Sequence, residues 1–183
     1  MKKILLVLAV LISALAVSAK DKTPGQPLVC DTVLQAPGLT ADQIYGKAKN
    51  WLANNMPNAT NIIQLDDDVN KHLISKATLG FEVNHLTLSS LTGYIRFTID
   101  IAARDGRYRV RFSDFNHEAV RDGWSEGPVY INGPNPNVKG LRKIQNSEMQ
   151  KRAVALCTQS IDSFLKSLQE AMSGTSSASQ GDW

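Results

Sequence analysis

Two runs of alternating apolar and polar residues dominate the middle of the chain. Between Tyr94 and Phe115 apolar side chains recur at every second position, which is the period of a strand with one buried face. The alternation pauses at Asp105 and Gly106, a pair typical of a two-residue hairpin turn. This turn predicts a register in which apolar faces coincide and opposite charges meet, with Ile99 opposite Phe112, Ile101 opposite Val110 and Asp100 opposite Arg111.

A helical spacing of apolar residues precedes this hairpin. Thr40 and Gln43 fit a capping box, and the apolar positions after them fall on one face until Pro57 forbids continuation. We therefore predict an amphipathic helix, with Trp51 as its anchor in the core.

A second helical segment lies near the end of the chain. Ser147 and Gln150 fit another capping box, and an apolar stripe then runs to Met172. The pattern predicts a long helix over residues 147–172 that lies across the sheet.

Three shorter runs complete the predicted sheet, namely Leu28–Leu34, Asn61–Asp66 and His72–Glu82. The polar stretch Asp67–Lys71 joins the last two as a hairpin. The expected fold is therefore α+β, with an antiparallel sheet of about five strands. Its order is strand, helix, then four strands, and both helices pack on one face of the sheet.

Residues 119–146 are rich in glycine, proline and asparagine, with one short apolar stretch, Val129–Ile131. We interpret them as a long loop with at most one edge strand. Trp124 and Tyr130 are its candidate contact residues.

The N-terminus has the pattern of a secretory signal. Lys2 and Lys3 precede the apolar run Ile4–Val17, and the small residues Ser18 and Ala19 follow. We predict a cleaved signal over 1–19, a flexible leader over 20–27, one domain over 28–172 and a disordered tail over 173–183. The mature chain is expected to have no transmembrane segment and to be periplasmic, associated with the outer membrane, or secreted.

Charge argues against a nucleic-acid partner. The formal net charge of +3 falls to +1 when the signal leaves, because it takes Lys2 and Lys3 and no acidic residue. A near-neutral exported protein has no general attraction for polyanions.

Cys30 and Cys157 are candidates for a single disulfide, because export places them where disulfides persist. The alternative is two buried free thiols.

No pattern in the chain points to catalysis or to a metal. The histidines lack ligand spacing, and Asp66, Asp68 and Asn70 match only the start of a calcium loop whose sixth residue, Lys71, is not glycine. We therefore predict no metal, no cofactor and no enzymatic activity.

One constellation suggests binding. Strand alternation places Arg107, Arg109 and Arg111 on one sheet face, with Arg96 on the neighbouring strand. Such a row can hold carboxylate or phosphate groups. Alternatively it is a solvated face that Asp100 and Asp114 balance.

The order of elements, with the strings YGKAKNWLANN, NIIQLDDD and DGRYRVRFSDF, resembles an uncharacterised family of exported Bacteroidota proteins with a TBP-like fold. The resemblance covers residues 28–118. It implies an antiparallel sheet backed by helices and carries no established activity. A DNA-binding role, which the name of the fold suggests, conflicts with export and near-neutral charge.

These patterns leave three functional hypotheses. The first is a non-catalytic envelope module that binds a protein, a glycan or an acidic small molecule through its exposed sheet face or long loop. The second is an accessory or structural subunit of an envelope complex, held through Trp124 and Tyr130. The third is an enzyme of unrecognised class.

Overall fold

The structure is a computed structural model that describes residues 25–56, 63–84 and 88–174. The predicted signal over 1–19, leader residues 20–24 and tail residues 175–183 lie outside the described residues.

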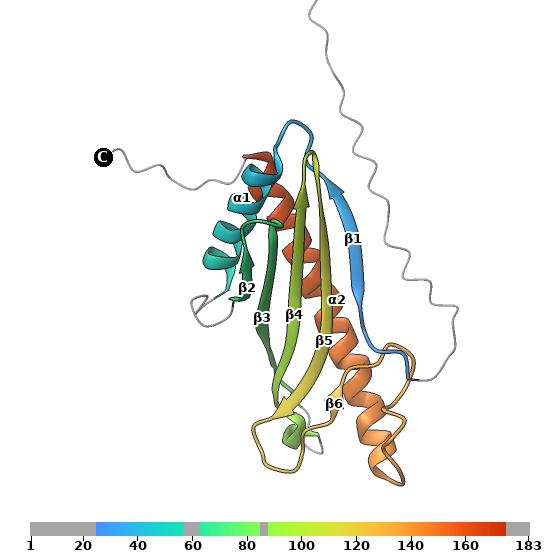
Figure 1. Ribbon diagram of the computed structural model, residues 1–183. Coiled ribbons are helices and arrows are strands. Elements are labelled where there is room, and N and C mark those ends of the chain that lie inside the picture. The colour runs from blue at the N-terminus through green and yellow to red at the C-terminus, as the bar shows by residue number, and fades with distance from the viewer. Residues whose placement is uncertain (1–24, 57–62, 85–87, 175–183) are drawn as a thin grey trace, which may run out of the picture.

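Six strands form a single antiparallel sheet in the order β1, β5, β4, β3, β2, with β6 beside β5. Figure 1 shows this sheet in front and the long helix α2 running diagonally behind it. The predicted α+β class, the antiparallel sheet and the helices on one face are confirmed. The strands are β1 (Cys30–Gln35), β2 (Ile63–Asp67), β3 (His72–Phe81), β4 (Gly93–Arg104), β5 (Arg107–Ala119) and β6 (Gly127–Pro128).

The central hairpin has the predicted register. Ile99 faces Phe112, Ile101 faces Val110 and Asp100 faces Arg111 across β4 and β5. Its turn is fixed to the rest of the fold, because the Asp105 carboxylate accepts a 2.7 Å hydrogen bond from the backbone N–H at the start of the first helix.

Strand β5 continues four residues beyond Phe115, where the sequence pattern predicts its end. The register shifts between Ser113 and Asn116, and Asp114 adopts a left-handed φ of 57°. This bulge turns both Phe112 and Phe115 toward the core although they are three residues apart. The extension also needs Gly93, because a Cβ there would lie 2.0 Å from the Glu118 carbonyl oxygen.

Helix α1 (Ala41–Asn55) confirms the first predicted helix. The Thr40 hydroxyl accepts a bond from the Gln43 N–H, and the Gln43 side chain bonds back to the Thr40 N–H. Trp51 is 3% exposed and donates its indole N–H to Ser167 of α2 at 2.9 Å, so it anchors the core as predicted.

Helix α2 (Arg142–Ser173) crosses the sheet on the same side as α1. Its Phe164 stacks against Phe97 and Phe112, with ring centroids 6.1 and 6.3 Å apart. Fully burying each such aromatic side chain contributes about 1.5–3 kcal/mol to folding. This aromatic cluster therefore joins α2 to β4 and β5.

The predicted start of this helix at Ser147 is wrong, because α2 begins five residues earlier at Arg142 without a side-chain cap. The Gln150 side chain does not complete a capping box. Its oxygen accepts from the Tyr130 N–H at 2.7 Å and its amide donates to the Pro128 carbonyl at 3.1 Å.

The segment after β5 is an integral part of the fold. Its β6 pairs with β5, and Val129 is 1% exposed. The predicted flexible leader is likewise wrong at its end, since Pro27 bridges to Tyr130 and the Ile131 N–H bonds to the Gln26 carbonyl at 3.0 Å.

In the described part of the chain, no helix has an apolar stretch long enough to cross a bilayer.

Candidate ligand-binding face

The sheet has one face that no helix of the described residues covers, which we call the free face. Residues at alternate positions of each strand point to it, while their neighbours enter the core. All four members of the predicted arginine row, Arg96, Arg107, Arg109 and Arg111, lie exposed on this face.

Two of these arginines are already paired. Arg109 binds Asp31 of β1 through two bonds, Nε to Oδ1 at 2.7 Å and Nη2 to Oδ2 at 2.5 Å. The bonds from Arg109 lower the pKa of the Asp31 carboxyl below its usual value. Arg96 lies 3.0 Å from Glu118.

The predicted balancing carboxylates act on the arginine row through their charges, Asp100 on Arg109 and Asp114 on Arg111, but among the described residues neither forms a salt bridge with it. Asp100 bonds instead to His72 of β3 at 2.8 Å, although its backbone faces Arg111 as predicted. Asp114 sits in the bulge, where hydrogen bonds from Thr98 and then Ser113 lower its pKa. The bulge redirects the Asp114 side chain. The alternation of apolar and polar residues in the sequence does not reveal where a bulge lies.

At the hairpin end of the free face, two arginines have no salt-bridge partner among the described residues. Arg104 and Arg107 face each other across β4 and β5, and neither has a salt bridge among the described residues. Asp105 lies between them in sequence, but its carboxylate is bonded to the start of α1. With Arg109 they surround a hollow of about 280 Å³, which we call the hairpin-end site; it is lined by Val33, Ala102, Arg104, Arg107, Tyr108 and Arg109.

Arg104 is the residue of this site that sequence reasoning missed. The signal was present, because a two-residue turn at Asp105 and Gly106 places Arg104 directly opposite Arg107. Arg111 belongs to the same face, next to Asp31 on one side and Asp100 on the other.

A second hollow of about 560 Å³ lies farther along the free face, beside the bulge. Lys76 donates to Thr98 at 2.6 Å, which in turn bonds to Asp114. The Lys76 ammonium and the Asp114 carboxylate are thus linked through the Thr98 hydroxyl, and their charges offset each other in the wall of this hollow. Its wall also includes Tyr94, which is half-exposed.

The two aromatic contact candidates of the loop help to attach the loop to the domain. Trp124 packs partly buried against the core, and the Arg121 guanidinium lies 5.6 Å from the centroid of its ring. Tyr130 is held through its backbone by Gln150. The structure therefore gives both residues a role within the fold.

Beneath this loop lies a buried polar cluster. The Glu126 side chain, 1% exposed, accepts bonds from Arg142 at 2.9 Å and from Asn146 at 2.7 Å. The Glu126 N–H donates to His117 Nδ1 at 3.1 Å, so the other ring nitrogen carries the proton that is donated to the Leu91 carbonyl at 2.7 Å. Burial lowers the pKa of His117. These contacts hold the loop on β5 and α2.

Both cysteines are free thiols in the structure, so the suggested disulfide is absent from it. Cys30 lies on β1 within reach of the charge of Asp162, which is more than one helical turn beyond Cys157 on α2. Burial raises the pKa of Cys157 to about 12 and also raises that of Cys30, which keeps both thiols protonated at neutral pH.

The carboxylates at the end of β2 and in the turn after it are bonded within the protein. Asp66 accepts from the Tyr45 hydroxyl and pairs with Lys49 at 2.5 Å. Asp68 pairs with Lys71 at 2.9 Å, and Lys71 occupies the left-handed region with φ 54°. Among the described residues, no three carboxylate, imidazole or thiol groups gather as metal ligands would.

An open antiparallel sheet with helices on one side and a bare opposite face defines a protein of the TBP-like class. Residues 31–118 match the family described as "Domain of unknown function (DUF4468) with TBP-like fold". This match confirms the predicted resemblance to an uncharacterised family with a TBP-like fold.

A solved structure agrees on the fold. A TBP-like protein from Parabacteroides distasonis ATCC 8503 superimposes with a TM-score of 0.57 at 9% identity, covering 78% of this chain and 93% of that chain. A DUF4468 family protein from Bacteroides ovatus ATCC 8483 gives a TM-score of 0.48 at 17% identity, covering 75% and 86%. A comparison with curated proteins found no match.

Proposed function

We propose that this protein is a non-catalytic binding module of the cell envelope, and that its hairpin-end site binds a ligand bearing carboxylate or phosphate groups. The observation that carries the proposal is the Arg104–Arg107 pair, two like charges directly opposite each other on an open sheet face. The predicted secretory signal over residues 1–19 supports a location in the cell envelope.

Like charges opposite each other across two strands are unfavourable for folding. An anion between two guanidinium groups reverses that effect, because each arginine offers a planar set of N–H donors that matches a carboxylate or phosphate. The apolar wall made by Val33 and Ala102 adds contact with the carbon atoms of a ligand.

The most direct test is Arg107→Glu. This change turns the like-charge pair with Arg104 into an opposite-charge pair, so the fold should keep its melting temperature or gain slightly. Affinity for an acidic probe should fall about tenfold to a hundredfold, the loss of one charge-assisted hydrogen bond. Backbone NMR titration with a polyglutamate peptide and with inorganic pyrophosphate measures both the affinity and the location of binding.

The matched control is Lys166→Glu, the same charge reversal at an exposed position of α2. It should leave the titration unchanged. Chemical-shift changes should gather at the ends of β4 and β5 and at Val33. If neither probe shifts these amides, or if Arg107→Glu binds as well as the unaltered protein, the hairpin-end site does not bind anions.

A further inference from the structure

The first turn of α2 projects beyond the end of the sheet and presents large apolar side chains to solvent. Figure 1 shows this turn and the loop before it at the lower end of the molecule, far from the β4–β5 turn. Leu141 is 87% exposed and Ile144 is 71% exposed. Single exposed aliphatic residues are common on protein surfaces, but these two lie three residues apart at one helix end and form a small apolar patch.

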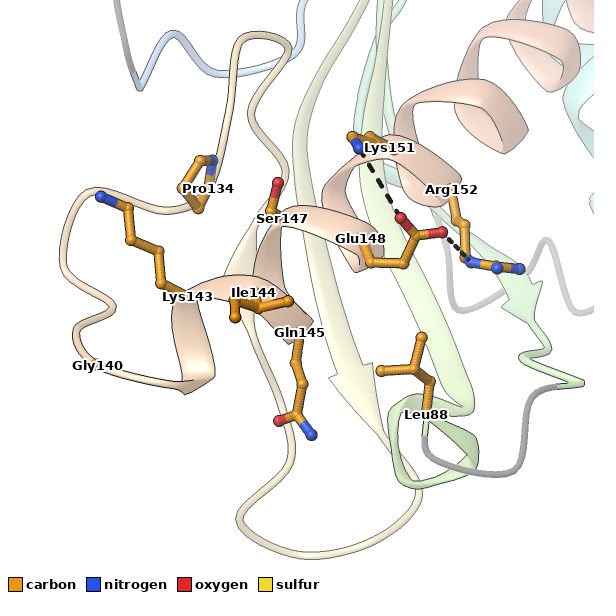
Figure 2. A pocket seen from close by; sticks show the side chains of 10 residues that line it. All are labelled: Leu88, Pro134, Gly140, Lys143, Ile144, Gln145, Ser147, Glu148, Lys151 and Arg152. Carbon is orange, nitrogen blue, oxygen red and sulfur yellow. Dashed lines mark hydrogen bonds and ion pairs between the residues drawn. The ribbon is translucent and has the colours of Figure 1, made fainter.

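The charges around these two residues have one sign. Residues 134–152 contain five cationic side chains and a single carboxylate, Glu148. Glu148 already pairs with Arg152 at 3.1 Å and lies 3.9 Å from Lys151, as Figure 2 shows. Nearby Glu126 is buried in its pair with Arg142. No carboxylate of this segment is therefore left to offset Lys139 and Lys143.

Lys139 precedes the two exposed aliphatic residues and Lys143 lies between them in the chain, and neither lysine has a salt bridge among the described residues. Figure 2 shows that Lys143 and Ile144 follow each other on the first turn of α2 and that their side chains point in different directions. The absence of a side-chain cap leaves the positive end of the helix dipole at the same place. We call Lys139, Leu141, Lys143 and Ile144 the α2 tip.

We infer that the α2 tip docks on the surface of an anionic lipid bilayer. Exposed aliphatic side chains can enter the boundary between headgroups and acyl chains, and neighbouring lysines can reach lipid phosphates. The occupant is anionic because Lys139 and Lys143 have no salt bridge among the described residues, and an anionic headgroup surface supplies the opposite charge beside an apolar layer. This contact goes beyond the proposed function, because it uses the opposite end of the molecule.

Co-sedimentation with vesicles tests the inference. The chain starting at Lys20 contains every described element and lacks the apolar run Ile4–Val17, which would itself bind lipid. It should sediment with vesicles of phosphatidylglycerol mixed with phosphatidylcholine, bind pure phosphatidylcholine far more weakly, and lose binding as salt is raised.

Two paired variants separate the contributions. Leu141→Ser with Ile144→Ser should weaken partitioning about tenfold by removing the inserted carbon atoms. Lys139→Glu with Lys143→Glu should weaken it by about fivefold or more for each lysine. Because these four side chains are exposed, the melting temperature should not change.

Val69→Ser is the matched control, since Val69 is 89% exposed in the β2–β3 turn at the other end of the molecule. It should bind vesicles like the unaltered protein. The inference is overturned if the unaltered chain does not sediment with anionic vesicles. It is also overturned if the double variant at Leu141 and Ile144 binds these vesicles as strongly as the unaltered chain does. The first result would leave an acidic protein as the occupant of the tip, and the second would place the lipid contact elsewhere.

Discussion

Tyr108 shows at the residue scale that this core tolerates an unfavourable polar group. Its hydroxyl is the buried side-chain atom that lacks a hydrogen-bond partner among the described residues, and its side chain is 1% exposed. Burial alone raises its pKa, so the phenol stays neutral. A buried, unpaired hydroxyl costs about 1–3 kcal/mol of folding free energy.

Tyr108→Phe should therefore raise the free energy of unfolding by about 1 kcal/mol, since it removes the unpaired oxygen and keeps the ring. Urea unfolding measures the change. Tyr94→Phe, at a half-exposed ring on the free face, is the control and should have no effect. A loss of stability in the Tyr108 variant would show that the hydroxyl has a partner.

His117 makes stability depend on pH. Both ring nitrogens are engaged in a way that fits the neutral form, and burial lowers the pKa from its ordinary 6.5. The unfolded chain then binds a proton that the folded chain does not, so stability is present above pH 6.5 and decreases as the pH falls below it.

The expected decrease is up to about 1.4 kcal/mol per pH unit, seen in urea unfolding between neutral pH and pH of about 5. His117→Gln can accept from the Glu126 N–H and donate to the Leu91 carbonyl without titrating. This variant should show a much flatter pH dependence over the same range. Equal slopes for both proteins would mean that another group controls acid sensitivity.

At the scale of elements, α2 and the loop before it are folded as one unit. The extra first turn of α2 exists because Arg142 and Asn146 both reach back to Glu126. Asn135 adds its backbone N–H to the Asn146 side chain at 2.6 Å. A loop rich in glycine and asparagine is thus held in place by buried polar contacts. The periodicity of apolar residues in the sequence does not predict such contacts.

Glu126→Ala should lower the free energy of unfolding by about 2 kcal/mol, because it leaves the Asn146 amide buried without its acceptor while Arg142 can return to water. Amide hydrogen exchange should show the loss of protection first in residues 126–146. Glu170→Ala, at an exposed position of α2, is the control. An unaltered exchange pattern in the Glu126 variant would exclude this cluster as the attachment of the loop.

At the scale of the whole molecule, the two proposed contacts lie at opposite ends. The twelve residues of β4 alone span about 40 Å between the lower end and the hairpin turn. Docking through the α2 tip would leave the hairpin-end site facing away from the bilayer. Because effects of distant substitutions are usually independent, Arg107→Glu should not alter vesicle binding, and the tip variants should not alter the titration with acidic probes.

Local patterns in the sequence were enough to determine most of the framework. The period of two, the Asp105–Gly106 turn and the Thr40–Gln43 capping box each depend on residues close together in the chain, and each prediction is confirmed. The arginine row follows from the same alternation. The family resemblance is confirmed for the same stretch of the chain.

Tertiary structure decided the features that depend on contacts between distant segments. Asp31 pairs with Arg109, seventy-eight residues later in the chain, because β1 lies beside β5. No local sequence pattern predicts that these two strands are neighbours. Contacts between distant segments also produce the bulge at Asp114 and the early start of α2. Leu141 is exposed because no other described segment covers it. Near neighbours in the chain were enough to predict the central hairpin, the first helix and the arginine face, whereas the end of β5 and the position of β6 depended on contacts with distant segments. The fold alone decided which charges remain unpaired, because pairing depends on what lies across space.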